Sequence, residues 1–286
     1  MHTPVLPELV LEYLALRPDG IYLDATAGLG GHTAAIAARL ESGVVIANDR
    51  DRDSLAMARA NTAAWADRIR YHHGSFSELS SALSAHGYEK ADGLLADLGV
   101  SRYQLTDAER GFSLSADGPL DMRMDREQDL TAEEIVNTYA EKALADLIYE
   151  LGQERRARKI ARAIVRARPI QSTLHLARVV ERAAPRTGRL HPATLTFMAL
   201  RIAVNDEQGQ LDRLLEGAPE LVRSGGRIVV IAFMSLEDRK VKRSFQSLAR
   251  EGRARLLTKH VIRPDEDEVR VNPASRSARL RAVEVI

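Results

Sequence analysis

The chain of 286 residues contains no cysteine. This absence excludes disulfide bridges, thiolate metal sites and cysteine nucleophiles. No run of about 18 apolar residues is present, so we expect no membrane-spanning helix. The first ten residues lack a basic segment followed by an apolar one, so we expect no secretory signal. The expected location is therefore the cytoplasm.

Metal centres and catalytic triads also lack support in the sequence. The eight histidines are scattered, apart from the pair His72-His73, so no metal site is predicted. No nucleophile-elbow pattern is present, so a Ser-His-Asp triad cannot be argued. The composition, 45% hydrophobic and 28% charged, is typical of a globular protein. The length allows one large domain or two smaller ones.

The net charge of +1 conceals a strong asymmetry along the chain. Residues 1–150 carry 13 basic and 25 acidic side chains, whereas residues 151–201 carry 12 basic and 2 acidic ones. Residues 223–281 carry 15 basic and 7 acidic side chains. Local basic regions on a nearly neutral chain favour a polyanionic partner such as nucleic acid. The alternative is a set of solvated, arginine-rich helix faces.

Strands and helices are expected to alternate in the first hundred residues. Short apolar runs predict strands at 21–23, 44–48, 69–71 and 91–96. Helical spacing of apolar residues lies between them, at 33–40 and 53–66. This alternation predicts right-handed βαβ units and a parallel sheet.

The alternation then stops, because residues 131–186 have the pattern of helices only. A helix is expected from Pro192 to about Val222. The later elements are expected to be a core strand at 227–233, a helix at 236–250 and strands at 256–260 and 278–286. We therefore predict an α/β, Rossmann-like sheet with an inserted all-helical domain. The predicted parts are residues 1–106, the insertion 107–190 and residues 191–286.

A glycine-rich turn follows the first predicted strand, in the sequence DATAGLGGH from Asp24 to His32. Glycines there allow positive φ and a close approach of backbone to a ligand, and a helix start offers free N–H donors. Thr33 stands where the third glycine of the dinucleotide fingerprint belongs, which weakens an NAD interpretation. A tight turn without a ligand is the alternative.

Asp49 ends the second predicted strand, 19 residues after Gly30. A carboxylate there can accept hydrogen bonds from both hydroxyls of a ribose. Together with the glycine turn, it indicates an adenosine-containing cofactor. The alternative is a helix N-cap, since Asp49, Asp51 and Asp53 all precede a helix. Asp49 is preferred because it lies nearest the strand end.

Asp97 ends the fourth predicted strand, and a long segment without clear helical or strand period follows it, from Gln104 to Asp125. Long irregular segments in compact proteins are usually functional, and open α/β sheets bind ligands at the carboxyl ends of their strands. Asp97 could accept a hydrogen bond from the exocyclic amine of a base and later take its proton. The alternative is a turn cap at Gly99.

Two later segments carry charge at predicted sheet edges. Residues 233–243, FMSLEDRKVKR, follow the last strong strand; Ser235 and Asp238 there fit a capping box. Residues 272–281, NPASRSARLR, interleave serine and arginine and could clamp a phosphate or ribose. A solvated hairpin approach explains the second segment equally well.

These segments, in this order, resemble the bacterial 16S ribosomal RNA (cytosine-N4)-methyltransferases, which act on a decoding-centre cytosine. The resemblance covers almost the whole chain. Its most specific string is GPLDMRMD, from Gly118 to Asp125. Further matching segments are HTPVL at 2–6, ERGFS at 109–113, HPAT at 191–194, ALRI at 199–202 and NP at 272–273 with RS at 276–277.

The resemblance implies a class I methyltransferase fold with S-adenosyl-L-methionine as cofactor and a helical insertion that recognises substrate. By matching motif, it places the cofactor contacts at Gly30, Gly31, His32, Asp49, Phe76, Asp97 and Gln104. Asp97 is the expected partner of the cytosine amine. Asp121, Arg123 and Asp238 are further catalytic candidates, which would orient the base or its phosphate.

The implied partner is 16S rRNA in the small ribosomal subunit. Methylation of another nucleic acid or a small molecule, and a non-catalytic role in ribosome assembly, are the alternatives. The sequence departs from the family pattern at Met234, where the family usually has histidine. Methionine can neither donate nor shuttle a proton. Arg102, Gln153 and Ala274 also depart from the pattern, and none of the four is an expected cofactor contact.

Overall fold

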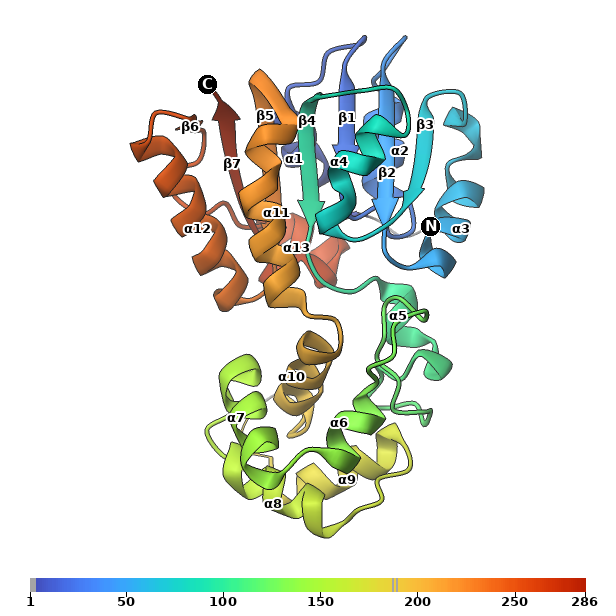
Figure 1. The fold of residues 1–286 in the computed structure, drawn as a ribbon, viewed down its shortest axis with the longest axis vertical. Coiled ribbons are helices and arrows are strands. Elements are labelled where there is room, and N and C mark those ends of the chain that lie inside the picture. The colour runs from blue at the N-terminus through green and yellow to red at the C-terminus, as the bar shows by residue number, and fades with distance from the viewer. Residues whose placement is uncertain (1–3, 187, 189) are drawn as a thin grey trace. The chain divides into compact units, whose positions relative to one another are not determined.

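The computed structural model describes residues 4–186, 188 and 190–286. Its centre is a sheet of seven strands in the order β3-β2-β1-β4-β5-β7-β6 (Figure 1). The strands are β1 Ile21–Asp24, β2 Val44–Asp49, β3 Ile69–His73, β4 Ala91–Asp97, β5 Val222–Ala232, β6 Ala254–Leu256 and β7 Arg279–Val285. Strands β1 to β5 pair in parallel, and β7 is antiparallel to both β5 and β6. The predicted α/β sheet is confirmed.

Alternate residues of the central strands point to opposite faces, as the period of two requires. Leu23 and Leu94 lie in one buried cluster with α4 (Leu79–Ser84), α11 (Glu207–Leu221) and α12 (Ser235–Arg250). Tyr22 and Leu95 lie in the cluster of the other face, with α1 (Pro7–Leu14) and α2 (Gly31–Ala37). Helix α3 (Arg52–Asn61) contributes Leu55 to that second cluster. The sheet is thus a layer between two layers of helices.

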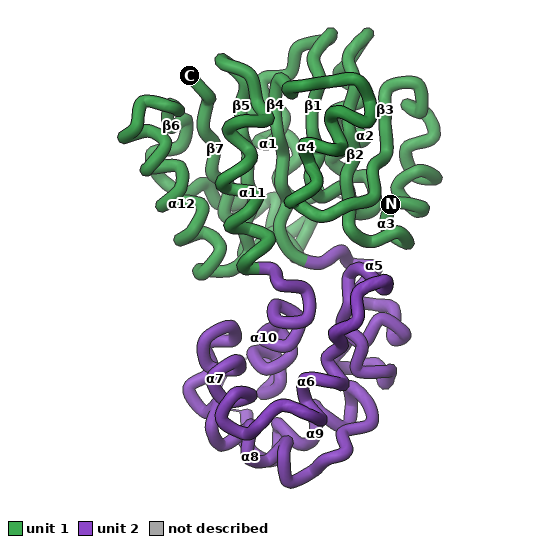
Figure 2. The backbone as a smooth tube through the Cα atoms, in the orientation of Figure 1, with its two compact units in different colours: residues 1–99, 208–286 green, residues 100–207 purple. Residues whose placement is uncertain are grey.

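The chain divides into two compact units, which Figure 2 shows in different colours. Unit 1 comprises residues 1–99 and 208–286, and unit 2 comprises residues 100–207. The helices of unit 2 are α5 Arg102–Thr106, α6 Ala132–Thr138, α7 Glu141–Gly152, α8 Ala157–Arg166, α9 Thr173–Ala183 and α10 Thr194–Val204. The predicted insertion, 107–190, lies inside unit 2.

Helix α10 lies in unit 2, although the sequence placed it with the sheet. Its Phe197 and Leu200 belong to the buried cluster that α6 to α9 form. The single helix expected from Pro192 to Val222 is two helices, because Asp206 takes a left-handed conformation with φ 46°. Four helices were not anticipated: α1, α4, α5 and the short α13, Glu266–Val271. No described helix has the length and apolarity that a bilayer crossing requires.

The segment after β4 is irregular, as predicted, but its backbone is tightly held. Arg110 is 1% exposed, and its guanidinium donates to the carbonyl oxygens of Arg123 and Met124. A Cβ at Gly118 would collide with the carbonyl oxygen of Ala108, so only glycine fits there. The GPLDMRMD string is therefore a packed structural element of unit 2.

Candidate active site

Three neighbouring strands of unit 1 each end in an aspartate: β1 in Asp24, β2 in Asp49 and β4 in Asp97. The order of the parallel strands reverses between β1 and β4, because β2 lies on one side of β1 and β4 on the other. Open α/β sheets bind ligands outside the strand ends at such a switch point. Asp24 and Asp97 therefore flank the place where a ligand is expected.

Asp24 is fully buried and holds the turn that follows it. Its carboxylate accepts a hydrogen bond from the Thr33 hydroxyl at 2.6 Å and one from the Thr26 N–H at 3.2 Å. Burial raises the pKa of Asp24 above its usual value, and the bond from Thr33 opposes that rise. The Asp24 side chain therefore has a structural role, which its sequence context does not indicate.

The turn after β1 is bonded to both neighbouring strands. The Ala27 N–H donates to the carbonyl oxygen of Asn48 on β2 at 2.8 Å. On the other side, the Asp97 N–H donates to the Thr26 hydroxyl at 2.7 Å. The Thr26 hydroxyl therefore links the position of Asp97 to that of the glycine turn.

Gly28 and Gly30 both have positive φ, at 52° and 87°. A Cβ on Gly30 would also lie 2.7 Å from the Thr62 methyl group. The Gly28 N–H donates to Asp49 Oδ2 at 2.7 Å, which joins the turn to the end of β2. Positive φ favours glycine at both positions, and at Gly30 the Thr62 methyl group also leaves no space for a Cβ.

Asp49 and Asp51, which the sequence left as alternatives, have different roles. The Asp51 carboxylate caps α3 by accepting from the N–H groups of Asp53 and Ser54. Asp49 accepts instead from Gly28 and, at 2.8 Å, from the Asp51 N–H. Burial raises the pKa of Asp49 to about 6, although both hydrogen bonds lower it. The helix-cap alternative for Asp49 is therefore excluded.

His32, on α2, faces Asp97. Its side chain is 6% exposed, and Nε2 lies 3.6 Å from Asp97 Oδ2. Within the described residues, neither ring nitrogen of His32 has a hydrogen-bond partner, and neither has Asp97 Oδ1. A buried ring and a half-buried carboxylate with buried, unsatisfied polar atoms thus lie together at the switch point, where a ligand can satisfy them.

Phe76 and Gln104, which entered through the family resemblance, lie in different units. Phe76 is half-buried in the short turn after β3, which Ser75 and Glu78 cap reciprocally. Two hydrogen bonds from Ser75 lower the pKa of Glu78 below its usual value. Gln104 is buried in α5 of unit 2, and its Oε1 accepts from the Ser101 N–H at 2.8 Å. Their contact with a cofactor stays a prediction.

Asp121 and Arg123 pair with each other inside unit 2. The Asp121 carboxylate accepts from Arg123 Nε at 2.8 Å and from Arg123 Nη2 at 3.0 Å. Arg123 Nη1 donates to the carbonyl oxygens of Arg126 and Gln128. The pair lowers the pKa of Asp121, against the effect of its burial. These bonds give the pair a structural role, and its predicted contact with the base stays a prediction.

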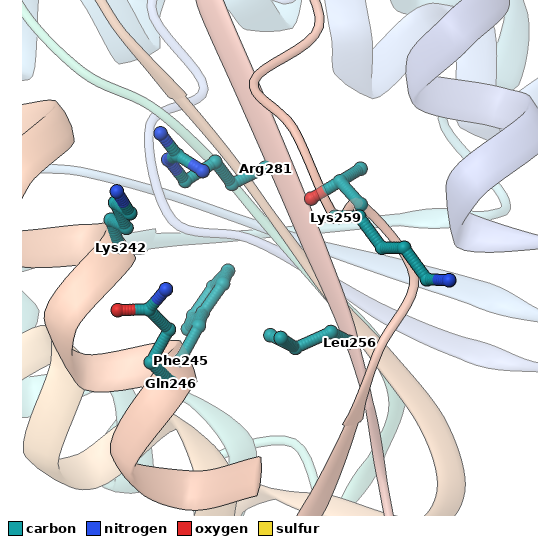
Figure 3. Close-up of a pocket in the computed structure, with 7 residues that line it drawn as sticks. Lys242, Phe245, Gln246, Leu256, Lys259 and Arg281 are labelled. Carbon is teal, nitrogen blue, oxygen red and sulfur yellow. The ribbon is translucent and has the colours of Figure 1, made fainter.

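Asp238, on α12, accepts from Arg281 Nε at 2.7 Å and from Arg281 Nη2 at 3.3 Å. Arg281 also lines a small hollow with Phe245 and Gln246 of α12 and Leu256 of β6 (Figure 3). Ser235 is the first residue of α12 rather than its cap, and Glu237 accepts from the backbone N–H groups before the helix. The predicted Ser235–Asp238 capping box is therefore wrong. The catalytic role of Asp238 stays a prediction.

Comparison with known proteins identifies the family. The model of the MraW methylase family matches residues 1–286. The chain belongs to this family. A curated relative from Solibacter usitatus, named Ribosomal RNA small subunit methyltransferase H, is 66% identical over 285 residues and covers 100% of both chains. A relative of the same name from Acidobacterium capsulatum is 49% identical and covers 99% of this chain and 98% of its own.

As an MraW methylase, the chain is a methyltransferase that depends on S-adenosylmethionine. The residues present fit that cofactor. Gly28 and Gly30 take the positive φ that favours glycine, and the Asp49 carboxylate accepts from the Gly28 N–H beside them. Asp97 Oδ1 is buried and has no partner among the described residues. A methylase from Streptococcus thermophilus, at TM-score 0.48 and 12% identity over the whole of this chain and 99% of its own, adds nothing to this assignment.

Proposed function

We propose that this MraW methylase transfers a methyl group to the N4 amine of a cytosine in 16S rRNA, at the decoding centre of the small ribosomal subunit. The observation that carries the chemistry is Asp97 at the switch point, with a buried carboxylate oxygen that has no partner among the described residues. The name of the relatives supports ribosomal RNA as the substrate. The choice of cytosine rests on the family resemblance of the sequence.

The proposed reaction is a direct in-line transfer. Bound S-adenosylmethionine supplies an electrophilic methyl group on a sulfonium sulfur. Asp97 Oδ1 accepts an N–H of the cytosine amine, which holds the nitrogen lone pair in a nucleophilic geometry, and then receives the proton. Asp49 would accept hydrogen bonds from the ribose hydroxyls, and Phe76 would stack on the adenine. The protein thus contributes mainly proximity and alignment.

The target base has to leave its stack to reach Asp97, as it does in other enzymes that act on bases. Unit 2 offers cations that would hold the surrounding RNA. Helix α8 buries Ile160 and Ile164 and exposes arginine and lysine on its other side. Arg162 pairs with Glu141, whereas no acidic partner of Arg158 or Lys159 is found in the described part of the chain. Unpaired cations are suited to phosphate contacts.

Charge reversal on α8 tests this surface. The double variant Arg158→Glu, Lys159→Glu is expected to weaken binding to small subunits and to lower the salt slope by about one for each phosphate that the helix no longer binds. The control is Arg39→Glu, which reverses a single charge at an exposed arginine of unit 1. Equal affinities and equal salt slopes for the two variants would mean that the exposed side of α8 does not bind RNA.

The cofactor affinity is expected to depend on pH through Asp49. Ribose hydroxyls donate to the ionised carboxylate, and the pKa of Asp49 is about 6. The dissociation constant for S-adenosylhomocysteine should therefore be about tenfold higher at pH 5 than at pH 8. The free energy of unfolding changes in the opposite direction. It falls as the pH rises from about 4 to 6, because the raised pKa of Asp49 makes ionising this carboxyl less favourable in the folded protein than in the unfolded chain.

Calorimetry of wild-type protein and Asp49→Asn separates this effect from other titrations. The variant should bind weakly, with a dissociation constant that no longer follows pH over this range. A wild-type constant that stays within about twofold between pH 5 and pH 8 would remove Asp49 as the ribose acceptor.

Radiolabelled methyl transfer to small subunits from cells lacking this enzyme, followed by nucleoside analysis, tests the proposed function. Label in N4-methylated cytidine is the expected result. Label in another nucleoside, or only in another nucleic acid or a small molecule, would replace the substrate. Binding without transfer would indicate a non-catalytic assembly factor.

A further inference from the structure

His32 presents a buried imidazole that the proposed transfer does not use. His32 is 5% exposed, and neither Nδ1 nor Nε2 has a hydrogen-bond partner among the described residues. Burying a polar group without a partner costs free energy. A side chain kept in this state beside a reactive carboxylate is best explained by a bond that forms during the reaction.

Among the described residues, Asp97 is the nearby acceptor that remains for the ring. Asp24, the other nearby carboxylate, already accepts from Thr33 and Thr26. Within the described residues, Asp97 is held through its backbone, by the bond from its N–H to the Thr26 hydroxyl and by the pairing of β4 with β5. Its Oδ2 faces His32 Nε2 at 3.6 Å, and its Oδ1 has no partner among the described residues. His32 is therefore the group placed to fix the rotation of this carboxylate.

We propose that His32 is a positioning residue, whose Nε2–H donates to Asp97 Oδ2 and so directs Oδ1 to the amine of the substrate. The proposal rests on the proposed function, because it requires Asp97 to receive the amine. The distance of 3.6 Å is longer than a hydrogen bond. Catalytic hydrogen bonds are often long in unliganded enzymes and tighten in the reacting complex.

The proton balance assigns the ring a donor role only. The nitrogen lone pair forms the bond to the methyl carbon, and the electron pair of the broken carbon–sulfur bond stays on sulfur. The amine proton passes to Asp97 Oδ1, while His32 keeps its Nε2–H throughout. A side chain that donates from the same place should therefore replace the imidazole, even if it cannot accept a proton.

Glutamine meets that requirement, because its amide N–H lies close to the position of the imidazole Nε2–H. His32→Ala is expected to lower kcat on small subunits about 100-fold, the cost of a misplaced catalytic group. His32→Gln should stay within about fivefold of wild type. His32 is also a predicted cofactor contact, and at the start of α2 its backbone N–H can make that contact. The dissociation constant for S-adenosylhomocysteine, measured by calorimetry, should then change less than about threefold in both variants.

A double variant tests the coupling to Asp97. Adding His32→Ala to Asp97→Asn should lower kcat by less than about a further threefold, because the two side chains act as one unit. If His32→Ala does not fold, His32→Leu takes its place, since leucine fills the volume without a donor. Both are compared with wild type by thermal unfolding before kinetics.

Three results would overturn the proposal. Wild-type kcat in His32→Ala would remove any role in the reaction. A loss in His32→Gln equal to that in the alanine variant would require the ring itself, as a proton acceptor. A weakened cofactor constant with unchanged kcat would make His32 a cofactor contact only. Full activity of Asp97→Asn would instead refute Asp97 as the proton acceptor. Label outside N4-methylated cytidine would refute the proposed function itself, so the failures are distinguishable.

Discussion

Replacing Asp97 by alanine is expected to lower kcat for methyl transfer about 1,000-fold, within the range that loss of a general base produces. The fold should tolerate the change. The bond from the Asp97 N–H to Thr26 and the pairing of β4 use only backbone atoms at this position. Within the described structure, the Asp97 carboxylate makes no hydrogen bond that the substitution would remove. Its one close polar neighbour there is His32, at 3.6 Å.

Two further variants define the role of the carboxylate. Asp97→Asn keeps the shape but cannot take the amine proton, so its kcat should fall nearly as far as that of the alanine variant. Asp92→Asn, at the other end of β4, is the matched control. The Asp92 carboxylate accepts from the Ile21 N–H at 2.8 Å and lies near Arg17 and Arg223. That variant should lose stability and keep kcat. Single-turnover rates near wild type in Asp97→Ala would refute the assignment.

The sheet could be predicted because its central strands are buried on both faces. Such strands have continuous apolar runs, as in β2 and β4, and each run ended at the carboxylate that the structure places at the sheet edge. The break between α10 and α11 could not be predicted. Helical periodicity continues through Asn205 and Asp206, and only the left-handed backbone of Asp206 separates the two helices.

The sequence predicted the individual residues of the site, and it did not predict the contacts between them. Glycines and a strand-end carboxylate indicated an adenosine-containing cofactor, because those residue types have few other uses at such positions. The choice between Asp49 and Asp51 needed the backbone bonds of both side chains. The approach of His32 to Asp97 joins residues 65 positions apart. No local pattern reports such an approach, since it depends on the pairing of β1 with β4.

Asn205→Ala is expected to destabilise unit 2 by about 2–5 kcal/mol, because two buried backbone groups lose their partner. Asn205 is 1% exposed. Its amide nitrogen donates to the Met122 carbonyl oxygen at 2.7 Å, and its amide oxygen accepts from the Met124 N–H at 2.8 Å. Between these bonds, Met122 is held at φ 60°, a conformation that needs support from its surroundings.

Asn137→Ala in the same unit is the matched control. Its amide makes the same two kinds of bond, both to Ile170, at 3.0 and 2.8 Å. Asn137 is half-buried, so water can replace the missing amide, and the expected cost is about 1 kcal/mol. Hydrogen exchange of individual amides separates unit 2 from the sheet, because the two units need not unfold together. A cost at Asn205 no greater than at Asn137 would mean that the irregular segment is held by its own packing, with Arg110 as its main anchor.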